Sequence, residues 1–246
     1  MSEFVSSHID NKVLHIELSR TDKKNALTSD MYTALTKEFA EAKSNSDIHV
    51  VLFKGAEGCF CAGNDIADFL EQPVLESGSP VLSFLKELYS FNKPIVAAVS
   101  GPAVGIGTTF LLHCDLVYAT EQTYFSLSFV DLGLCPEAGS SYLLPRQIGY
   151  VRAAELLLLA EPFDAHKAKE WGIINDIIEP ENYWQFAQEK AEKLAQKPAH
   201  ALQVSRQLIR SNASMVGQAI EREARSFSEL LKSDEAKAIF KKFLEK

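Results

Sequence analysis

The sequence predicts an α/β protein whose C-terminal part is helical. Two observations support this fold class. Short apolar runs, typical of buried strands, alternate with helical patterns over the first 150 residues, and from about residue 151 helical patterns continue alone. No low-complexity segment divides the 246 residues. We therefore expect an α/β core over residues 1–195, followed by a C-terminal helical region over residues 196–246.

The elements of the first half follow from apolar periodicity and from turn residues. Strands are predicted over Val13–Leu18, His49–Lys54, Ile95–Val99, Asp115–Ala119 and Phe125–Phe129. Thr28 or Ser29 caps a helix in which apolar residues recur every four positions. Further helices are expected over Val81–Phe91, over the apolar segment Thr108–Cys114, and from near Ala138.

The second half shows six helical segments. They cover residues 152–160, 165–171, 181–197, 199–212, 215–231 and 233–246. The last one begins with a Ser-Asp-Glu sequence, which is typical of a helix N-terminus. Such a run of helices after an alternating core is the basis of the proposed boundary near residue 195.

Composition and charge exclude several classes of protein. The formal net charge of −8 argues against a general nucleic-acid or membrane-surface binder. We expect no secretory signal and no membrane-spanning segment, since the sequence has no suitable apolar run, and Phe243–Lys246 does not suggest a peroxisomal address. Four cysteines suggest no disulfide framework, and the spacing of Cys59 and Cys61 does not suit zinc. The expected compartment is the cytoplasm, with no bound metal.

Two turns rich in small residues each follow a predicted strand. They are Phe60–Asp65 and Gly101–Gly107. Small residues let a ligand approach the backbone, and two free N–H groups aimed at one oxygen make an oxyanion hole. The alternative is a pair of tight strand–helix turns without a ligand. A dinucleotide fingerprint is excluded, because Phe110 stands where its third glycine is required.

Glu137 differs from the other carboxylates in its surroundings. Most acidic residues lie in charged helical stretches, whereas Glu137 lies among apolar and small residues. Burial there would raise its pKa toward neutrality, as a general base requires. The alternative is an acid that only stabilises a helix N-terminus. A serine hydrolase is excluded by the lack of G-x-S-x-G, and the six histidines show no metal-binding spacing.

Several segments, in the same order, resemble the enoyl-CoA hydratase/isomerase family, also called the crotonase family. They are Arg20–Leu27 (RTDKKNAL), Phe60–Ile66 (FCAGNDI), Lys93–Gly107 (KPIVAAVSGPAVGIG) and Ala168–Ile174 (AKEWGII). Together with the C-terminal helices, they make the resemblance cover most of the chain. It implies a crotonase-like spiral of ββα units with a helical C-terminal trimerisation region, assembled as trimers or as hexamers of two trimers.

The resemblance also implies a site for an acyl-CoA thioester. The N–H groups of Ala62 and Ile106 would form the oxyanion hole. Substrate and CoA contacts would come from Lys24, Asn25, Ala26, Ala62, Gly63, Asn64, Asp65, Ile66, Gly105 and Ile106. No metal or other cofactor is implied, since CoA is part of the substrate. Lys23, Lys24 and the pair Lys241–Lys242 are candidates for the CoA phosphates. The pocket for the acyl chain would be built from residues such as those of Leu70–Leu88.

The resemblance to the hydratases fails at two positions. Alignment on Cys114–Asp115 places their two catalytic glutamates at Thr109 and Phe129, neither of which is an acid. The chain instead resembles the Δ3,Δ2-enoyl-CoA isomerase branch, in which the catalytic glutamate lies in a Pro-Glu loop like Pro136–Gly139. Glu137 would then move a proton from C2 to C4 of a 3-enoyl-CoA in fatty acid degradation. The alternatives are another family activity, such as hydratase or acyl-CoA hydrolase, and a non-catalytic acyl-CoA-binding protein.

Overall fold

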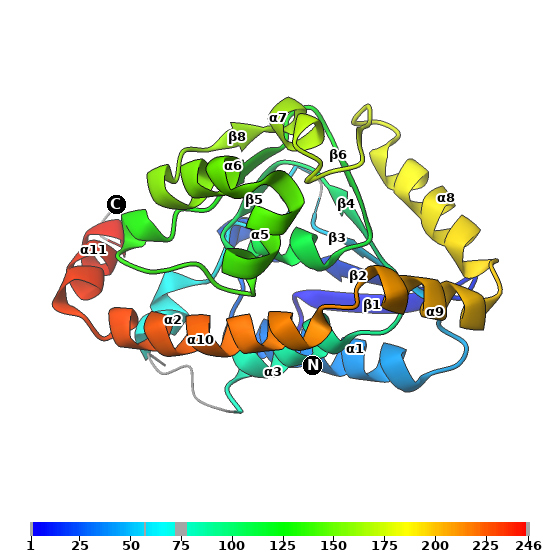
Figure 1. Ribbon diagram of the computed structural model, residues 1–246, viewed down its shortest axis with the longest axis horizontal. Coiled ribbons are helices and arrows are strands. Elements are labelled where there is room, and N and C mark those ends of the chain that lie inside the picture. The colour runs from blue at the N-terminus through cyan, green and yellow to red at the C-terminus, as the bar shows by residue number, and fades with distance from the viewer. Residues whose placement is uncertain (1, 57, 72–77, 245–246) are drawn as a thin grey trace.

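The computed structural model describes residues 2–56, 58–71 and 78–244. Its larger sheet has six strands in the order β1-β2-β3-β4-β6-β9. Figure 1 labels β1, β2, β3, β4 and β6 of this sheet. They are β1 (Val5–Asp10), β2 (Val13–Leu18), β3 (Val50–Lys54), β4 (Ile95–Val99), β6 (Leu116–Ala119) and β9 (Asp176–Ile177). Only β1 and β2 pair antiparallel; the other neighbours are parallel. Strand β4 is buried along its whole length, as expected for a parallel strand covered on both faces.

A second, three-stranded sheet lies in the order β5-β7-β8. It consists of β5 (Pro102–Val104), β7 (Tyr124–Ser126) and β8 (Phe163–Asp164), with β5 and β7 parallel. Strand β5 directly follows β4, so the chain passes from one sheet to the other at Ser100–Gly101. That crossing carries the second glycine-rich turn away from the large sheet and toward the first turn.

The helices surround these sheets (Figure 1). They are α1 (Ser29–Ser44), α2 (Ile66–Glu71), α3 (Pro80–Ser90), α4 (Ile106–Thr109), α5 (Ser140–Ile148), α6 (Tyr150–Ala154), α7 (Ala165–Glu170), α8 (Tyr183–Ala195), α9 (Ala199–Ile209), α10 (Ala213–Leu231) and α11 (Asp234–Leu244). Helix α8 covers β2, β3 and β4 on one face of the large sheet, and α10 contacts both α3 and α5. No described helix is long and apolar enough to cross a membrane.

The α/β class with C-terminal helices is confirmed, and so are most elements within a few residues. Thr28 caps α1 by accepting a hydrogen bond from the N–H of Met31, and Ser233 accepts one from Ala236 at the start of α11. The boundary between residues 195 and 196 stays a prediction. Helix α10 nevertheless packs so closely on α3 and α5 that the C-terminal region contributes to the interior of the core.

Three predicted elements are wrong in detail. The strand over Phe125–Phe129 ends at Ser126, because the chain turns at residues 128–129 and then enters a 3-10 helix over Val130–Leu132. The helix over Thr108–Cys114 is split into α4 and a 3-10 helix over Phe110–His113. The helix over residues 152–160 changes from α6 to a π-helical turn over Glu155–Leu159. Strands β1, β5, β8 and β9 were not predicted; the last three have only two or three residues, too few for periodicity to register.

Candidate active site

The two glycine-rich turns lie side by side and are joined by backbone hydrogen bonds. Cys61 donates its N–H to the carbonyl of Pro102 at 2.9 Å, and Val104 donates to the carbonyl of Cys61 at 2.9 Å. Gly107 is required by this closeness, because a Cβ there would lie 2.5 Å from the Cys61 carbonyl oxygen. The two turns therefore form one backbone unit.

The structure corrects one of the two predicted oxyanion donors. The N–H of Ala62 donates to the carbonyl of Lys24 at 2.9 Å, so it is not free to bind a ligand. Leu27 and Asn64 form a parallel bridge, in which Leu27 donates to Gly63 and Asp65 donates to Leu27. The N–H of Asn64 points away from that bridge and has no hydrogen-bond partner among the described residues.

The second predicted donor, Ile106, is available. It is the first residue of α4, and its N–H has no hydrogen-bond partner in the described parts of the chain. Gly105 before it has φ 54°, a value that suits glycine, and donates its own N–H to Ser126. A Cβ on Gly105 would lie 3.9 Å from Cα of Gly63, so the turn of Asn64 is close by. Asn64 and Ile106, not Ala62 and Ile106, supply the free donors.

Glu137 lies in the loop between the 3-10 helix Val130–Leu132 and α5, and it is 5% exposed. Thr109 on α4 donates its hydroxyl to Oε1 of Glu137 at 2.6 Å. The next residue, Ala138, has φ 57°, and its carbonyl lies 2.7 Å from Nε2 of His113. Burial lowers the pKa of His113 to about 3, so the ring is neutral and its Nε2–H donates to that carbonyl.

The electrostatics of Glu137 suit a general base. Burial raises its pKa to about 8, with a smaller contribution from the negative charge of Glu223, while the hydrogen bond from Thr109 acts in the opposite direction. An acid with a pKa near neutrality can both accept and return a proton. The expectation that an apolar loop would raise the pKa of Glu137 therefore agrees with the structure.

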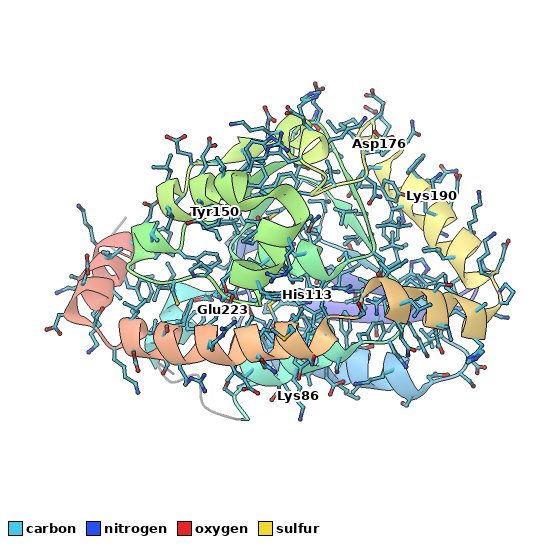
Figure 2. The ribbon with its side chains drawn as sticks, viewed as in Figure 1. Lys86, His113, Tyr150, Asp176, Lys190 and Glu223 are labelled. Carbon is cyan, nitrogen blue, oxygen red and sulfur yellow. The ribbon has the colours of Figure 1, made fainter. Side chains whose placement is uncertain are left out.

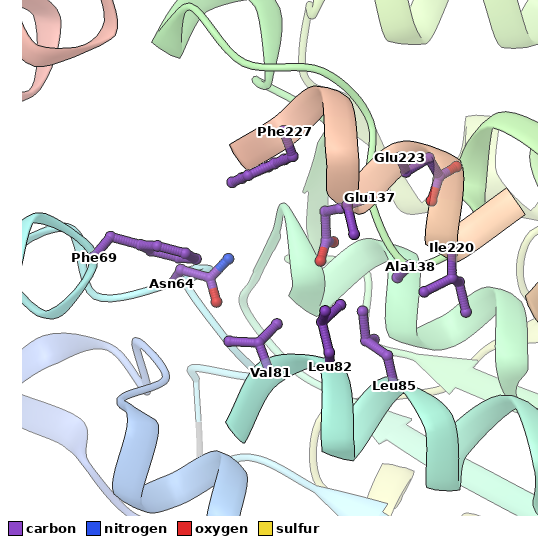
Figure 3. A pocket seen from close by; sticks show the side chains of 11 residues that line it. Asn64, Phe69, Val81, Leu82, Leu85, Glu137, Ala138, Ile220, Glu223 and Phe227 are labelled. Carbon is purple, nitrogen blue, oxygen red and sulfur yellow. The ribbon is translucent and has the colours of Figure 1, made fainter. Parts of the chain in front are cut away.

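A small cavity lies between Glu137 and Asn64. Its walls come from the first turn, α2, α3, the Glu137 loop and α10, through Asn64, Phe69, Val81, Leu82, Leu85, Glu137, Ala138, Ile220, Glu223, Ala224 and Phe227. Figure 3 shows the Glu137 carboxyl and the Asn64 side chain pointing into the same space. Tyr32 donates its hydroxyl to Oδ1 of Asn64 and so fixes the orientation of that amide. Most other wall residues are apolar, which keeps water away from the carboxyl.

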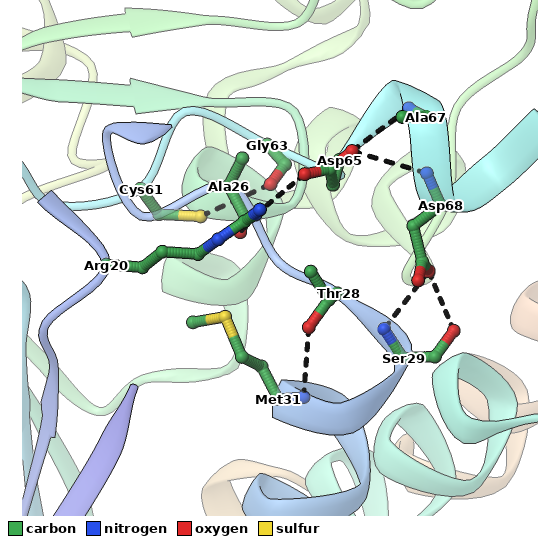
Figure 4. A network of polar contacts seen from close by, with 10 residues as sticks. All are labelled: Arg20, Ala26, Thr28, Ser29, Met31, Cys61, Gly63, Asp65, Ala67 and Asp68. Atoms are coloured by element: carbon green, nitrogen blue, oxygen red, sulfur yellow. Dashed lines mark hydrogen bonds and ion pairs between the residues drawn. The ribbon is translucent and has the colours of Figure 1, made fainter. Parts of the chain in front are cut away.

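The predicted CoA-binding segment is held by a polar network (Figure 4). Arg20 donates to Asp65 at 2.7 Å and to the carbonyl of Ala26 at 2.9 Å. Burial alone would raise the pKa of Asp65, but the hydrogen bond from Arg20 and those from the N–H groups of α2 hold it below its usual value. Asp68 accepts hydrogen bonds from the N–H and hydroxyl of Ser29, which ties α2 to α1.

The predicted contact residues differ in their access to a ligand. The side chain of Asn25 is fully buried and donates to the carbonyls of Cys59 and Phe60, so it braces the first turn and cannot reach a ligand. Lys23 and Lys24 are exposed, as are Lys241 and Lys242 on α11. Ala26 and Ile66 are half-buried, and Gly63 is buried. Of the expected acyl pocket Leu70–Leu88, residues 72–77 lie outside the described residues, whereas Val81, Leu82 and Leu85 line the cavity.

Two polar residues of the site were missed from sequence. Glu223 on α10 lines the cavity, and Tyr32 on α1 orders Asn64. The sequence does mark Glu223, because it follows Val216 and Ile220 at helical spacing on the buried face of α10, where a carboxyl side chain is unusual. No comparable signal marks Tyr32. Thr109 and Phe129 are both buried, and neither supplies a second acid.

Comparison with known proteins identifies the family. The model of the family described as enoyl-CoA hydratase/isomerase matches residues 8–246, and the chain belongs to this family. It is 34% identical over 218 residues to 1,2-epoxyphenylacetyl-CoA isomerase of Escherichia coli (strain K12), covering 86% of this chain and 83% of that protein. It is 32% identical over 206 residues to enoyl-CoA delta isomerase 2 of Rattus norvegicus, covering 81% of this chain and 52% of that protein.

A solved structure gives the same result for the fold. The structure of Pseudomonas aeruginosa OdaA superposes with a TM-score of 0.97 at 40% identity and covers 100% of both chains. The predicted crotonase-like fold is confirmed. The chain is a member of an enzyme family that acts on acyl-CoA thioesters, which agrees with a cavity lined by Asn64 and by the buried acid Glu137.

Proposed function

We propose that the protein is a Δ3,Δ2-enoyl-CoA isomerase that converts 3-enoyl-CoA thioesters to trans-2-enoyl-CoA. The observation that carries the proposal is Glu137, a buried carboxyl with its pKa raised to about 8, in the same cavity as Asn64. The free N–H groups of Asn64 and Ile106 would bind the thioester oxygen. This pairing of one acid with two backbone donors suits the movement of a proton along the acyl chain.

Each group has one task in the reaction. Hydrogen bonds from Asn64 and Ile106 stabilise the negative charge that develops on the thioester oxygen when the C2 proton leaves. The ionised Glu137 accepts that proton, and the charge spreads over the dienolate to C4. Glu137 then returns the proton at C4, so the double bond moves from C3=C4 to C2=C3 and no atom is added. Thr109 orients the carboxyl through its hydrogen bond to Oε1.

Hydration has less support than isomerisation. Water addition in this family needs two acids, and Thr109 and Phe129 stand at their positions. Glu223 cannot replace them as it is placed, since both of its carboxylate oxygens accept hydrogen bonds from Gly139 and Ser141. Among the described residues that line the cavity, Glu137 thus remains the acid available to the substrate, and one acid suffices to move a proton.

The acyl chain has a route out of the cavity. A larger groove, of about 1240 Å³, lies between α3 and α10 and shares Leu82, Ile220 and Ala224 with the Glu137 cavity. A chain bound with C2 at Glu137 would pass these three residues into the groove. The proposal therefore includes substrates longer than the cavity itself, as expected for an enzyme of fatty acid degradation.

The proposal includes assembly and CoA binding. Two groups of largely exposed apolar residues, on α6 with the π-helical turn and on α9, suit contacts between identical chains: Tyr150, Val151, Leu158, Leu159, Leu208 and Ile209. We assign them to the trimer expected from the family. Lys24 is placed beside the first turn to pair with a CoA phosphate, and the site needs no further cofactor.

The test is turnover of a chain-length series of 3-enoyl-CoA substrates by the wild type and by Glu137→Gln. The substitution keeps the shape of the side chain but leaves no group that can take up a proton, so we expect turnover to fall about a hundredfold to ten-thousandfold. The wild-type kcat/KM should rise with pH up to about 8, because the base must be ionised. Unchanged turnover in Glu137→Gln would refute the role of Glu137. If the protein hydrates a 2-enoyl-CoA faster than it isomerises a 3-enoyl-CoA, the result would favour a hydratase. Binding of an acyl-CoA without turnover would favour a non-catalytic protein.

A further inference from the structure

Glu223 is a second buried carboxyl at the site, and it comes from a distant part of the chain. It lies on α10, is 7% exposed, and lines the cavity that also contains Glu137. Figure 2 shows it on the side of α10 that faces α5. A buried acid costs stability unless its oxygens are hydrogen-bonded, so its partners indicate what it is for.

All three hydrogen bonds to the Glu223 carboxyl come from the segment directly after Glu137. Gly139 donates its N–H to Oε2 at 2.6 Å. Ser141 donates its N–H to Oε1 at 2.9 Å and its hydroxyl to the same oxygen at 2.5 Å. These donors belong to the start of α5, where Gly139 offers no side chain as a cap. Glu223 therefore caps α5 from another helix.

This cap lies two residues from the acid/base. Between them, Ala138 and Gly139 have φ values of 57° and 76°, so the loop has an uncommon backbone conformation. The loop has another support in the hydrogen bond between His113 and the Ala138 carbonyl. Val216 and Ile220, on the same face of α10 as Glu223, pack against Gly139. The position of Glu137 thus depends on α10.

We propose that Glu223 is a positioning residue that holds the Glu137 loop in its reactive conformation through the N-terminus of α5. It does not touch the reacting atoms, because its oxygens are used by Gly139 and Ser141. Its role deepens the proposed isomerase function: it makes the acid/base of the core dependent on the C-terminal helical region.

The same arrangement has an electrostatic effect on Glu137. The Glu223 charge adds to the burial that raises the pKa of Glu137. The other titratable groups near Glu137 are Tyr32 on α1, Cys61 in the first turn and Cys135 in its own loop. Burial raises the pKa of each of these, so all three are neutral near pH 7. Burial also raises the pKa of Glu223, whereas its hydrogen bonds from Ser141 and Gly139 and the nearby Arg222 favour the ionised form. Glu223 is therefore the described neighbour that can add a negative charge.

The test uses Glu223→Gln, with Glu229→Gln as a matched control on an exposed position of α10. The new amide presents an NH₂ group where a native oxygen accepts a hydrogen bond, so at least one of the three bonds becomes repulsive. We expect kcat for isomerisation to fall about tenfold to a hundredfold with KM changed by less than about threefold, since small displacements of a catalytic group have such effects. The midpoint of the kcat/KM profile should also move to lower pH. The control should match the wild type.

A second measurement does not depend on activity. Infrared difference spectra, with Glu137→Gln as the reference, follow the protonation of Glu137 without substrate, and its midpoint should lie lower in Glu223→Gln than in the wild type. If that midpoint and kcat both stay unchanged in a folded variant, the positioning role is refuted even though the isomerase proposal stands. If the wild type has no isomerase activity, a shifted midpoint still supports the role of Glu223.

A milder variant covers the case in which Glu223→Gln fails to fold. Ser141→Ala removes the 2.5 Å bond and leaves the other two in place. We expect a smaller fall in kcat, about twofold to tenfold, again with little change in KM. Activity equal to the wild type in Ser141→Ala, at equal thermal stability, would contradict the proposal.

Discussion

The two sides of the site are built by different means. The oxyanion side is backbone: the turns around Asn64 and Ile106 are joined by main-chain hydrogen bonds and belong to the N-terminal core. The acid side is a side chain on a loop, held by Thr109, His113 and Glu223. The first is fixed by the local fold, whereas the second depends on contacts from three separate elements. We therefore expect the backbone donors to tolerate side-chain substitutions, whereas the position and pKa of Glu137 should respond to substitutions at distant residues.

The largest expected effect concerns the cost of keeping the acid buried. The pKa of Glu137 is raised from 4.5 to about 8, so the folded protein binds this proton more tightly than the unfolded chain does. The contribution of this bound proton to the free energy of unfolding is fully present below pH 4.5 and is lost as the pH rises through 8. The Glu137→Gln variant lacks this titrating carboxyl. As the pH rises from 4.5 to 8, its free energy of unfolding relative to the wild type should increase by at most about 5 kcal/mol.

Denaturant unfolding of both proteins at pH 5 and pH 9 measures this difference. Only the change between the two pH values matters, because the groups remote from Glu137 titrate alike in both proteins. The exposed Glu229→Gln serves as the control for loss of one carboxyl. A constant difference across the range would show that Glu137 is not held in a desolvating environment, and the acid side would then be more open than the structure indicates.

The next effect tests the backbone side. Ile106→Pro removes the N–H at the first position of α4, where proline fits a helix. We expect kcat to fall about a hundredfold to a thousandfold, the usual effect of losing one oxyanion donor. Ile106→Val keeps the N–H and most of the packing, so its activity should stay close to that of the wild type. A folded proline variant with normal kcat would exclude Ile106 as a donor.

The smallest expected effect tests whether the oxyanion side and the acid side are independent of each other. Asn25→Ala removes the amide that donates to the carbonyls of Cys59 and Phe60, and leaves both without that partner. We expect a loss of about 1–3 kcal/mol in the free energy of unfolding. The pH midpoint of activity should not move, because the acid side does not include Asn25. A shifted midpoint would show that the two sides are coupled through the first turn.

Sequence reasoning succeeded where one local pattern decides the outcome. A few consecutive residues suffice to predict the cap at Thr28, the buried strand β4 and the two turns of small residues. It failed for Ala62, because the N–H that remains free depends on the carbonyl of Lys24, which folding alone brings there. For Glu137 the flanking residues left two roles open. Helices α3 and α10 bury its carboxyl, which favours the role of a general base. Both helices are distant from Glu137 in sequence, so the flanking residues could not indicate this burial.

The backbone origin of the oxyanion donors has a consequence for how such a protein can evolve. Every residue except proline supplies an N–H, so substitutions at Asn64 or Ile106 alter the shape of the site without deleting a donor. Under the proposed function, selection can therefore exchange the acid, its loop and the acyl pocket while the donors to the enolate oxygen persist. A lineage with this scaffold can pass from one acyl-CoA reaction to another through intermediates that already stabilise the common charge.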